Sequence, residues 1–197
     1  MPSIDRPHYQ HSSLAEFAPR AKAFCELVET YADFSLQTFL QETHRALAGL
    51  YVSALSLPDL EVLFDISNDE ANDDEYEPIE RKPDTDRRTH EEWRVMFREL
   101  GAFFGPHNSY REVFNPYDPP EDKEGFGNLA DDISDIYGDL RLGLRHWERG
   151  ETGEALWEWR SNFGFHWSDY LTGALRALNA LASNHKLEWP SAAPGTT

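Results

Sequence analysis

The sequence predicts an all-α protein: a single-domain bundle of about five helices with a long acidic loop. Apolar residues recur with the 3.6-residue period of a helix over five segments. Aromatic residues make up 13% of the 197 residues, far more than a disordered chain contains. A chain of this length can bury a core without disulfides. Cys25 is the one cysteine, so we expect no internal disulfide and a reducing compartment.

The first two helices are expected near the N-terminus. Ser13 and Glu16 have the spacing of a capping box and open an apolar stripe that reaches Tyr31. Pro19 either kinks this helix or marks its first turn. The second helix is expected over residues 35–55.

Two further helices follow similar signals. Thr89 and Glu92 form a second capping box, and the Gly-Pro pair at 105–106 ends the helix that they open, at about Phe104. Asn128 is the expected N-cap of the fourth helix, which Gly150 ends.

The last expected helix runs over residues 152–182 as one continuous element. Before the fourth helix, residues 110–114 (YREVF) alternate and favour a short extended piece. Residues 115–127 are rich in proline and glycine and predict a loop.

The composition of the sequence predicts one domain with flexible ends. We expect a flexible leader at 1–12, a bundle over 13–184 with a mobile acidic loop at 65–88, and a disordered tail at 185–197. The acids outnumber the bases by 36 to 18, for a net charge of −18. This charge argues against binding nucleic-acid phosphates or an anionic membrane. With no secretory signal and no long apolar run, we expect a cytoplasmic protein.

Three stretches resemble a bacterial family of helical domains of unknown function, family 5063. They are YREVFNPYDP (110–119), LADDISDIYGDLRLG (129–143) and ALWEWRSNFGFHWSDYLTGALRAL (155–178). The resemblance covers about residues 14–182 and implies an all-helical fold and no established activity. Family members often carry a second histidine where this chain has Tyr170.

The fourth helix carries four aspartates at helical spacing: Asp131, Asp132, Asp135 and Asp139. Paired carboxylates on one helix can hold Mg²⁺ or Mn²⁺. Asp132, Asp135 and Asp139 with His166 are therefore the candidate metal ligands. The alternative is a surface helix whose acids match the positive end of its dipole.

A structural ion pair is a competing explanation. Arg160 lies in phase with the apolar stripe of the last helix, where an arginine needs a partner. An ion pair of Arg160 with Asp132 or Asp139 would neutralise both the arginine and that aspartate.

For two histidines and two aromatic residues, the sequence allows both a structural and a functional role. His44 and His166 lie on helix shoulders and are candidate bases or hydrogen-bonded boundary residues. Trp157 and Phe165 fall off the apolar stripe, so they either cover residues 110–114 or form an exposed patch for a partner. The sequence lacks a phosphate-binding glycine loop, and it lacks the GxSxG and HExxH motifs.

Three functions remain. The first is a non-enzymatic interaction or regulatory module for a protein partner with a basic or apolar surface, without a cofactor. The second is a hydrolase of a phosphorylated small molecule that uses Mg²⁺ or Mn²⁺ at the aspartates. The third is mimicry of a nucleic acid by surface carboxylates, which the net charge suggests.

Overall fold

The computed structural model describes residues 12–59, 90–112 and 125–183. Of the calls outside these ranges, the acidic loop at 65–88 and the tail at 185–197 lie entirely beyond the described residues. The leader at 1–12 does so except for Ser12, the first residue of α1. In the described parts, no helix is long and apolar enough to cross a membrane.

The described chain is almost entirely helical, as predicted. Its helices are α1 (Ser12–Glu29), α2 (Leu36–Ala54), α4 (His90–Phe104), α5 (Leu129–Glu148), α6 (Thr152–Asn162) and α7 (Ser168–Ser183). Short 3-10 turns lie at η1 (Tyr31–Asp33) and η3 (Gly105–His107). A hairpin of β1 (Ser109–Glu112) and β2 (Gly125–Asn128) forms the small sheet.

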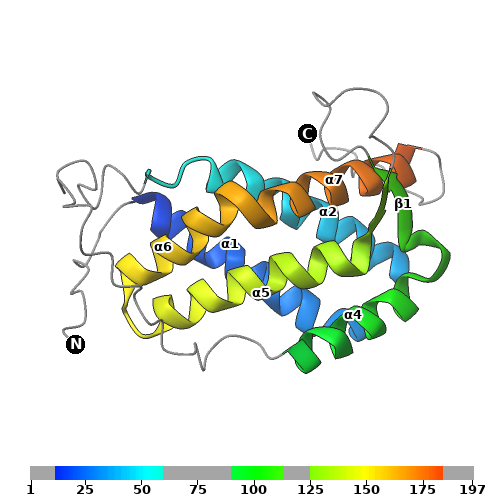
Figure 1. The fold of residues 1–197 in the computed structure, drawn as a ribbon, viewed down its shortest axis with the longest axis horizontal. Coiled ribbons are helices and arrows are strands. Elements are labelled where there is room, and N and C mark those ends of the chain that lie inside the picture. The colour runs from blue at the N-terminus through cyan, green and yellow to red at the C-terminus, as the bar shows by residue number, and fades with distance from the viewer. Residues whose placement is uncertain (1–11, 60–89, 113–124, 184–197) are drawn as a thin grey trace, which may run out of the picture.

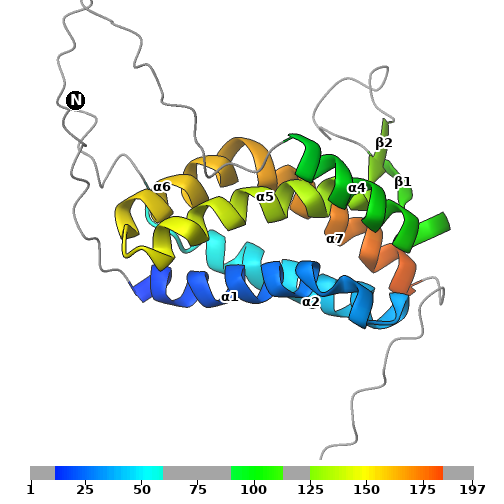
Figure 2. The ribbon, with the colours of Figure 1, turned by 90° about the horizontal axis from the view of Figure 1, so that it is seen from below.

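The helices form two layers (Figures 1 and 2). In Figure 2, α1 and α2 lie side by side beneath α5, α6 and α7. Helix α5 packs against α1, α4, α6 and α7, so it is enclosed by the rest of the bundle. The hairpin lies at the same end as α4 and contacts α5 and α7 through β2.

Local signals explain where the helices begin. Ser35 caps α2 through its hydroxyl, which accepts the Thr38 N–H, and Asn128 caps α5 by accepting from Ala130 and Asp131. Pro19 lies inside α1, so it does not mark the start of that helix.

Two predictions about the chain path need correction. Residues 125–127 were expected in a loop, but with Asn128 they pair in antiparallel register with β1, with Tyr110 opposite Gly127. The expected continuous helix over residues 152–182 contains a π-helical turn, η5 (Phe163–Trp167). A π turn takes up more residues than an α turn, so it shifts the helical phase between α6 and α7.

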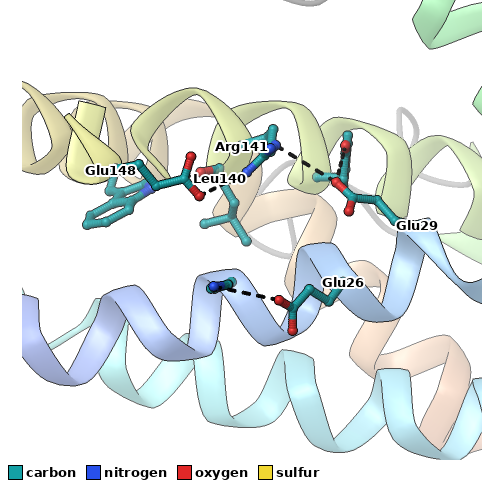
Figure 3. Close-up of polar contacts among 8 residues, drawn as sticks. Glu26, Glu29, Leu140, Arg141 and Glu148 are labelled. Atoms are coloured by element: carbon teal, nitrogen blue, oxygen red, sulfur yellow. Dashed lines mark hydrogen bonds and ion pairs between the residues drawn. The ribbon is translucent and has the colours of Figure 1, made fainter. Parts of the chain in front are cut away.

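Polar contacts join α1 to α5 at the bundle surface (Figure 3). Arg141 of α5 lies between two carboxylates, with Nε 3.8 Å from Glu29 Oε1 and Nη1 3.4 Å from Glu148 Oε1. Tyr137 donates to the same Glu29 oxygen at 2.8 Å. Exposed ion pairs of this kind contribute little stability, so they align the helices more than they hold them together.

The tightest packing in the core joins α5 to α6. Trp159 is fully buried, and its indole N–H donates to the Leu140 carbonyl at 3.1 Å. The indole occupies the space above Gly143, where a Cβ would lie 2.2 Å from Nε1. Phe17 of α1 packs on the same indole, with ring centroids 4.9 Å apart. Gly143 therefore lets three helices meet at one aromatic side chain.

We predict that Gly143→Ala destabilises the protein. The added methyl forces the indole out of its place, and such overpacking costs about 1–3 kcal/mol. For a chain of this size that lowers Tm by about 2–12 °C. The matched control is Gly138→Ala on the same helix, where a Cβ meets nothing within 4 Å. Thermal melts of both variants test this: the control should gain up to about 1 kcal/mol from better helix propensity. An unchanged Tm for Gly143→Ala would contradict the packing.

Candidate functional site

A cleft with a volume of about 650 Å³ lies between the hairpin, α5 and the η5–α7 segment. Its charged lining residues come from all of these elements: Glu112, Asp131, Asp132, His166, Asp169 and Arg176. Phe126 of β2 and Phe165 of η5 also line it, and their side chains are 80% and 75% exposed. The cleft thus combines carboxylates with two exposed aromatic rings.

Each aspartate that faces the bundle from α5 takes a donor from a different element. The Tyr110 hydroxyl of β1 lies 2.8 Å from Asp132 Oδ2. The Trp93 indole N–H of α4 donates to Asp135 Oδ1 at 2.7 Å. Asp139 Oδ2 lies 2.6 Å from His166 Nδ1. These contacts fasten the hairpin, α4 and the η5–α7 segment to α5.

The predicted metal ligands are therefore not brought together as a metal site. Among the residues that the structure describes, no group of three or more His, Cys, Asp or Glu side chains is arranged to hold a metal ion. The reason is geometric, because Asp132 and Asp139 are seven residues apart and so about 10 Å apart along the helix axis.

The predicted ion pair of Arg160 with Asp132 or Asp139 is wrong. Arg160 Nη2 lies 2.5 Å from Asp59 Oδ1, beyond the end of α2. Its guanidinium also lies 6.0 Å from the centre of the Phe163 ring. The prediction aligned Arg160 with α7 as if the helix were continuous, and the π turn between them changes that phase.

Burial dominates the electrostatics of α5. Asp132 is only 3% exposed, and this burial raises its pKa to about 8, aided by the nearby charges of Glu112, Asp131 and Asp135. The hydrogen bond from Tyr110 acts in the opposite direction. Burial likewise raises the pKa of Asp131 and of Asp135.

Tyr110 lies between two carboxyl groups. Its hydroxyl donates to Asp132 at 2.8 Å and makes a longer contact of 3.3 Å with Glu112. Glu112 pairs with Arg176 at 3.0 Å, which favours its charged form. Asp132 has no such cationic partner among the described residues, and burial raises its pKa to about 8. Of the two carboxyls, Asp132 is therefore the one that holds a proton near neutral pH.

Two glycines make room for this network. A Cβ on Gly127 would lie 2.2 Å from Tyr110 Cζ, and a Cβ on Gly173 would lie 2.5 Å from Glu112 Oε1. The sequence analysis missed Tyr110, Glu112 and Arg176. The alternation of residues 110–114 is the signal that could have placed Tyr110 and Glu112 on one face.

His166 pairs with Asp139 beside the cleft. Its partner Asp139 is nearly buried, while the imidazole is 43% exposed and lines the cleft. A carboxylate at Nδ1 leaves Nε2 as the ring nitrogen available to the cleft. His44, the other candidate, lies on α2 and does not line the cleft. Phe165 is exposed, so of the two alternatives for it the structure favours the exposed patch.

Comparisons with known proteins place the chain in a family. The model of a family described as "Domain of unknown function (DUF5063)" matches residues 9–184. The chain belongs to this family. Among solved structures, this DUF5063 chain is similar to protein BF1032 from Bacteroides fragilis, a structural genomics target. The two are 22% identical with a TM-score of 0.63, over 89% of this chain and 98% of that one. No curated protein matches. At this identity the likeness shows a shared fold.

We predict that Asp132→Asn removes a pH-dependent loss of stability. Between about pH 4 and pH 8 the folded protein holds a proton on Asp132 that the unfolded chain has lost, so stability falls as pH rises through this window. The loss is at most about 1.4 kcal/mol per pH unit. Asparagine cannot ionise, so the variant should match the wild type at pH 4 and exceed its Tm increasingly up to pH 8.

Thermal melts from pH 4 to 9 measure this difference. Asp169→Asn is the control, because Asp169 is exposed at the start of α7 and its replacement should leave the pH profile unchanged. A difference between Asp132→Asn and wild type that stays constant over this range would disprove the proton on Asp132.

Proposed function

We propose that this DUF5063 domain is a non-enzymatic interaction module whose cleft accepts a lysine or arginine side chain of a protein partner. The single observation that supports this is that two exposed phenylalanines, Phe126 and Phe165, line the same cleft as several carboxyl groups. Large exposed aromatic side chains on a soluble domain are typical of binding surfaces.

Charge complementarity decides the kind of partner. Four carboxyl groups line the cleft, against one arginine and one histidine. Arg176 is already paired with Glu112, so a ligand with phosphate or carboxylate groups would meet net negative charge. A cationic side chain is attracted instead, and its aliphatic part can pack on the phenylalanine rings.

The metal-dependent hydrolase receives no support from this geometry. Of its four proposed ligands, Asp139 and His166 pair with each other, whereas Asp132 and Asp135 take separate partners from β1 and α4. The acidic lining also disfavours a phosphorylated substrate.

We predict that Phe126→Ala and Phe165→Ala each weaken binding of a lysine–leucine peptide several-fold. The probe is a fluorescein-labelled, acetylated and amidated peptide of alternating lysine and leucine, and binding is measured by fluorescence polarisation. Each truncation removes apolar contact worth about 1 kcal/mol, which is about fivefold in Kd. The same peptide with glutamate for lysine should not bind.

Controls separate the cleft from the general acidity of the chain. Val52→Ala and Leu55→Ala truncate exposed apolar residues on or next to α2, at 67% and 62% exposure, and should leave binding unchanged. Asp169→Asn should weaken binding more than Glu16→Gln, which removes a charge from exposed α1 surface. Equal effects of the cleft and control variants would show non-specific attraction and refute the proposal.

A further inference from the structure

Asp132 has one carboxyl oxygen committed to the fold and one that is not. Oδ2 contacts the Tyr110 hydroxyl at 2.8 Å. Among the described residues, Oδ1 has no hydrogen-bond partner, and it is not sealed off from the surface. Asp132 lines the cleft although the residue is 97% buried. An unpartnered oxygen on a buried carboxyl that lines a cleft is placed to contact a ligand.

Asp132 is surrounded by other carboxyl groups, one of which, Glu112, is paired with Arg176. The groups that face it from the packed elements are Tyr110 and Glu112 of β1, Asp131 and Asp135 of α5, and Tyr170 of α7. The cleft is also lined by His166, Asp169 and Arg176, and Arg176 is paired with Glu112. Among the described lining residues, no second lysine or arginine is available to Asp132.

These neighbours account for both states of the carboxyl. Without a ligand, the nearby carboxylates and the burial oppose a charge on Asp132, so a proton takes the place of a counter-ion. A cation that reaches Oδ1 supplies the missing positive charge and removes the reason for holding the proton.

We propose that Asp132 is the residue that binds the ligand's ammonium or guanidinium group, and that it exchanges its proton for that cation. This inference rests on the proposed cation-binding function of the cleft. In the exchange, the O–H bond of the Asp132 carboxyl breaks and its proton passes to bulk solvent. The carboxylate left behind pairs with the incoming cation, which keeps its own protons. One positive charge enters the cleft as one leaves.

The exchange ties affinity to pH. A ligand cation that pairs with ionised Asp132 binds the protonated form more weakly, so its affinity rises with pH through the titration of Asp132. A tenfold preference for the ionised form lowers the apparent pKa of Asp132 by one unit when the ligand is saturating.

The first test follows the Asp132 carboxyl carbon by ¹³C NMR, with Asp132→Asn used to assign the signal. In the free protein we expect the signal to titrate far above the usual aspartate range. Methylguanidinium chloride at 50 mM should then shift the midpoint downward relative to 50 mM NaCl. A free-protein midpoint in the ordinary range, or a midpoint that the probe does not move, overturns the inference. Neither readout requires the peptide to bind.

The second test counts protons during peptide binding. Isothermal titration of the lysine–leucine peptide at pH 7, in buffers with different ionisation enthalpies, should show release of up to one proton per peptide. Asp132→Asn should bind the peptide more weakly and release no proton, so its titration is run at a higher peptide concentration. Glu16→Gln, on exposed α1 surface, should release protons as the wild type does.

The outcomes separate the inference from the function on which it rests. Peptide binding without proton release would overturn the exchange and leave the interaction module standing. Loss of specific peptide binding, together with a midpoint moved by methylguanidinium, would refute the protein partner and support Asp132 as a cation-binding residue. A midpoint that is high but unmoved, with no specific binding, would refute both.

Discussion

The enclosure of α5 is the constraint on which the rest of the structure depends. Helix α5 contacts α1, α4, α6 and α7, so little of it can face water. On the side toward α6, Gly143 has no side chain and so leaves room for the Trp159 indole. On the side toward the hairpin it carries carboxyl groups, which are costly to bury without partners. The neighbouring elements are held where they can supply those partners.

Because these buried carboxyl groups need partners, three aspartates of α5 hold neighbouring elements against the helix. Asp132, Asp135 and Asp139 recur along α5 with the helical period and take donors from β1, α4 and η5. Their burial also sets their chemistry, because a buried carboxyl that lacks a cation keeps its proton. The interactions that hold the hairpin on the bundle therefore prepare the lining of the cleft. The structural role of Asp132 and the role that we propose for it in the cleft both follow from its burial.

The cleft gives a physical basis for function in a DUF5063 domain. It lies where the hairpin, α5 and the η5–α7 segment meet, and its residues come from distant parts of the chain. The π turn contributes two consecutive residues, Phe165 and His166, to the lining of the cleft. π turns inside helices are often found at functional sites. The similarity to the Bacteroides fragilis protein covers 89% of this chain and shows a shared fold.

The sequence by itself determined the helices, because helical periodicity and capping residues are local. The stripe of α5 and its Asn128 cap were predicted, and the all-α class and the family are confirmed. It also drew attention to Asp132, Asp139 and His166, because acids and a histidine beside an apolar stripe are unusual. Only the tertiary structure decided their partners. The pairing of Asp139 with His166, and of Asp132 with Tyr110, depends on contacts between residues 27 and 22 positions apart. Arg160 shows most clearly what local spacing cannot predict. The five-residue π turn after α6 shifts the helical phase of α7 relative to α6, and Arg160 pairs with Asp59. Side-chain pairing depends on the relative rotation and position of whole helices, and local spacing does not fix either.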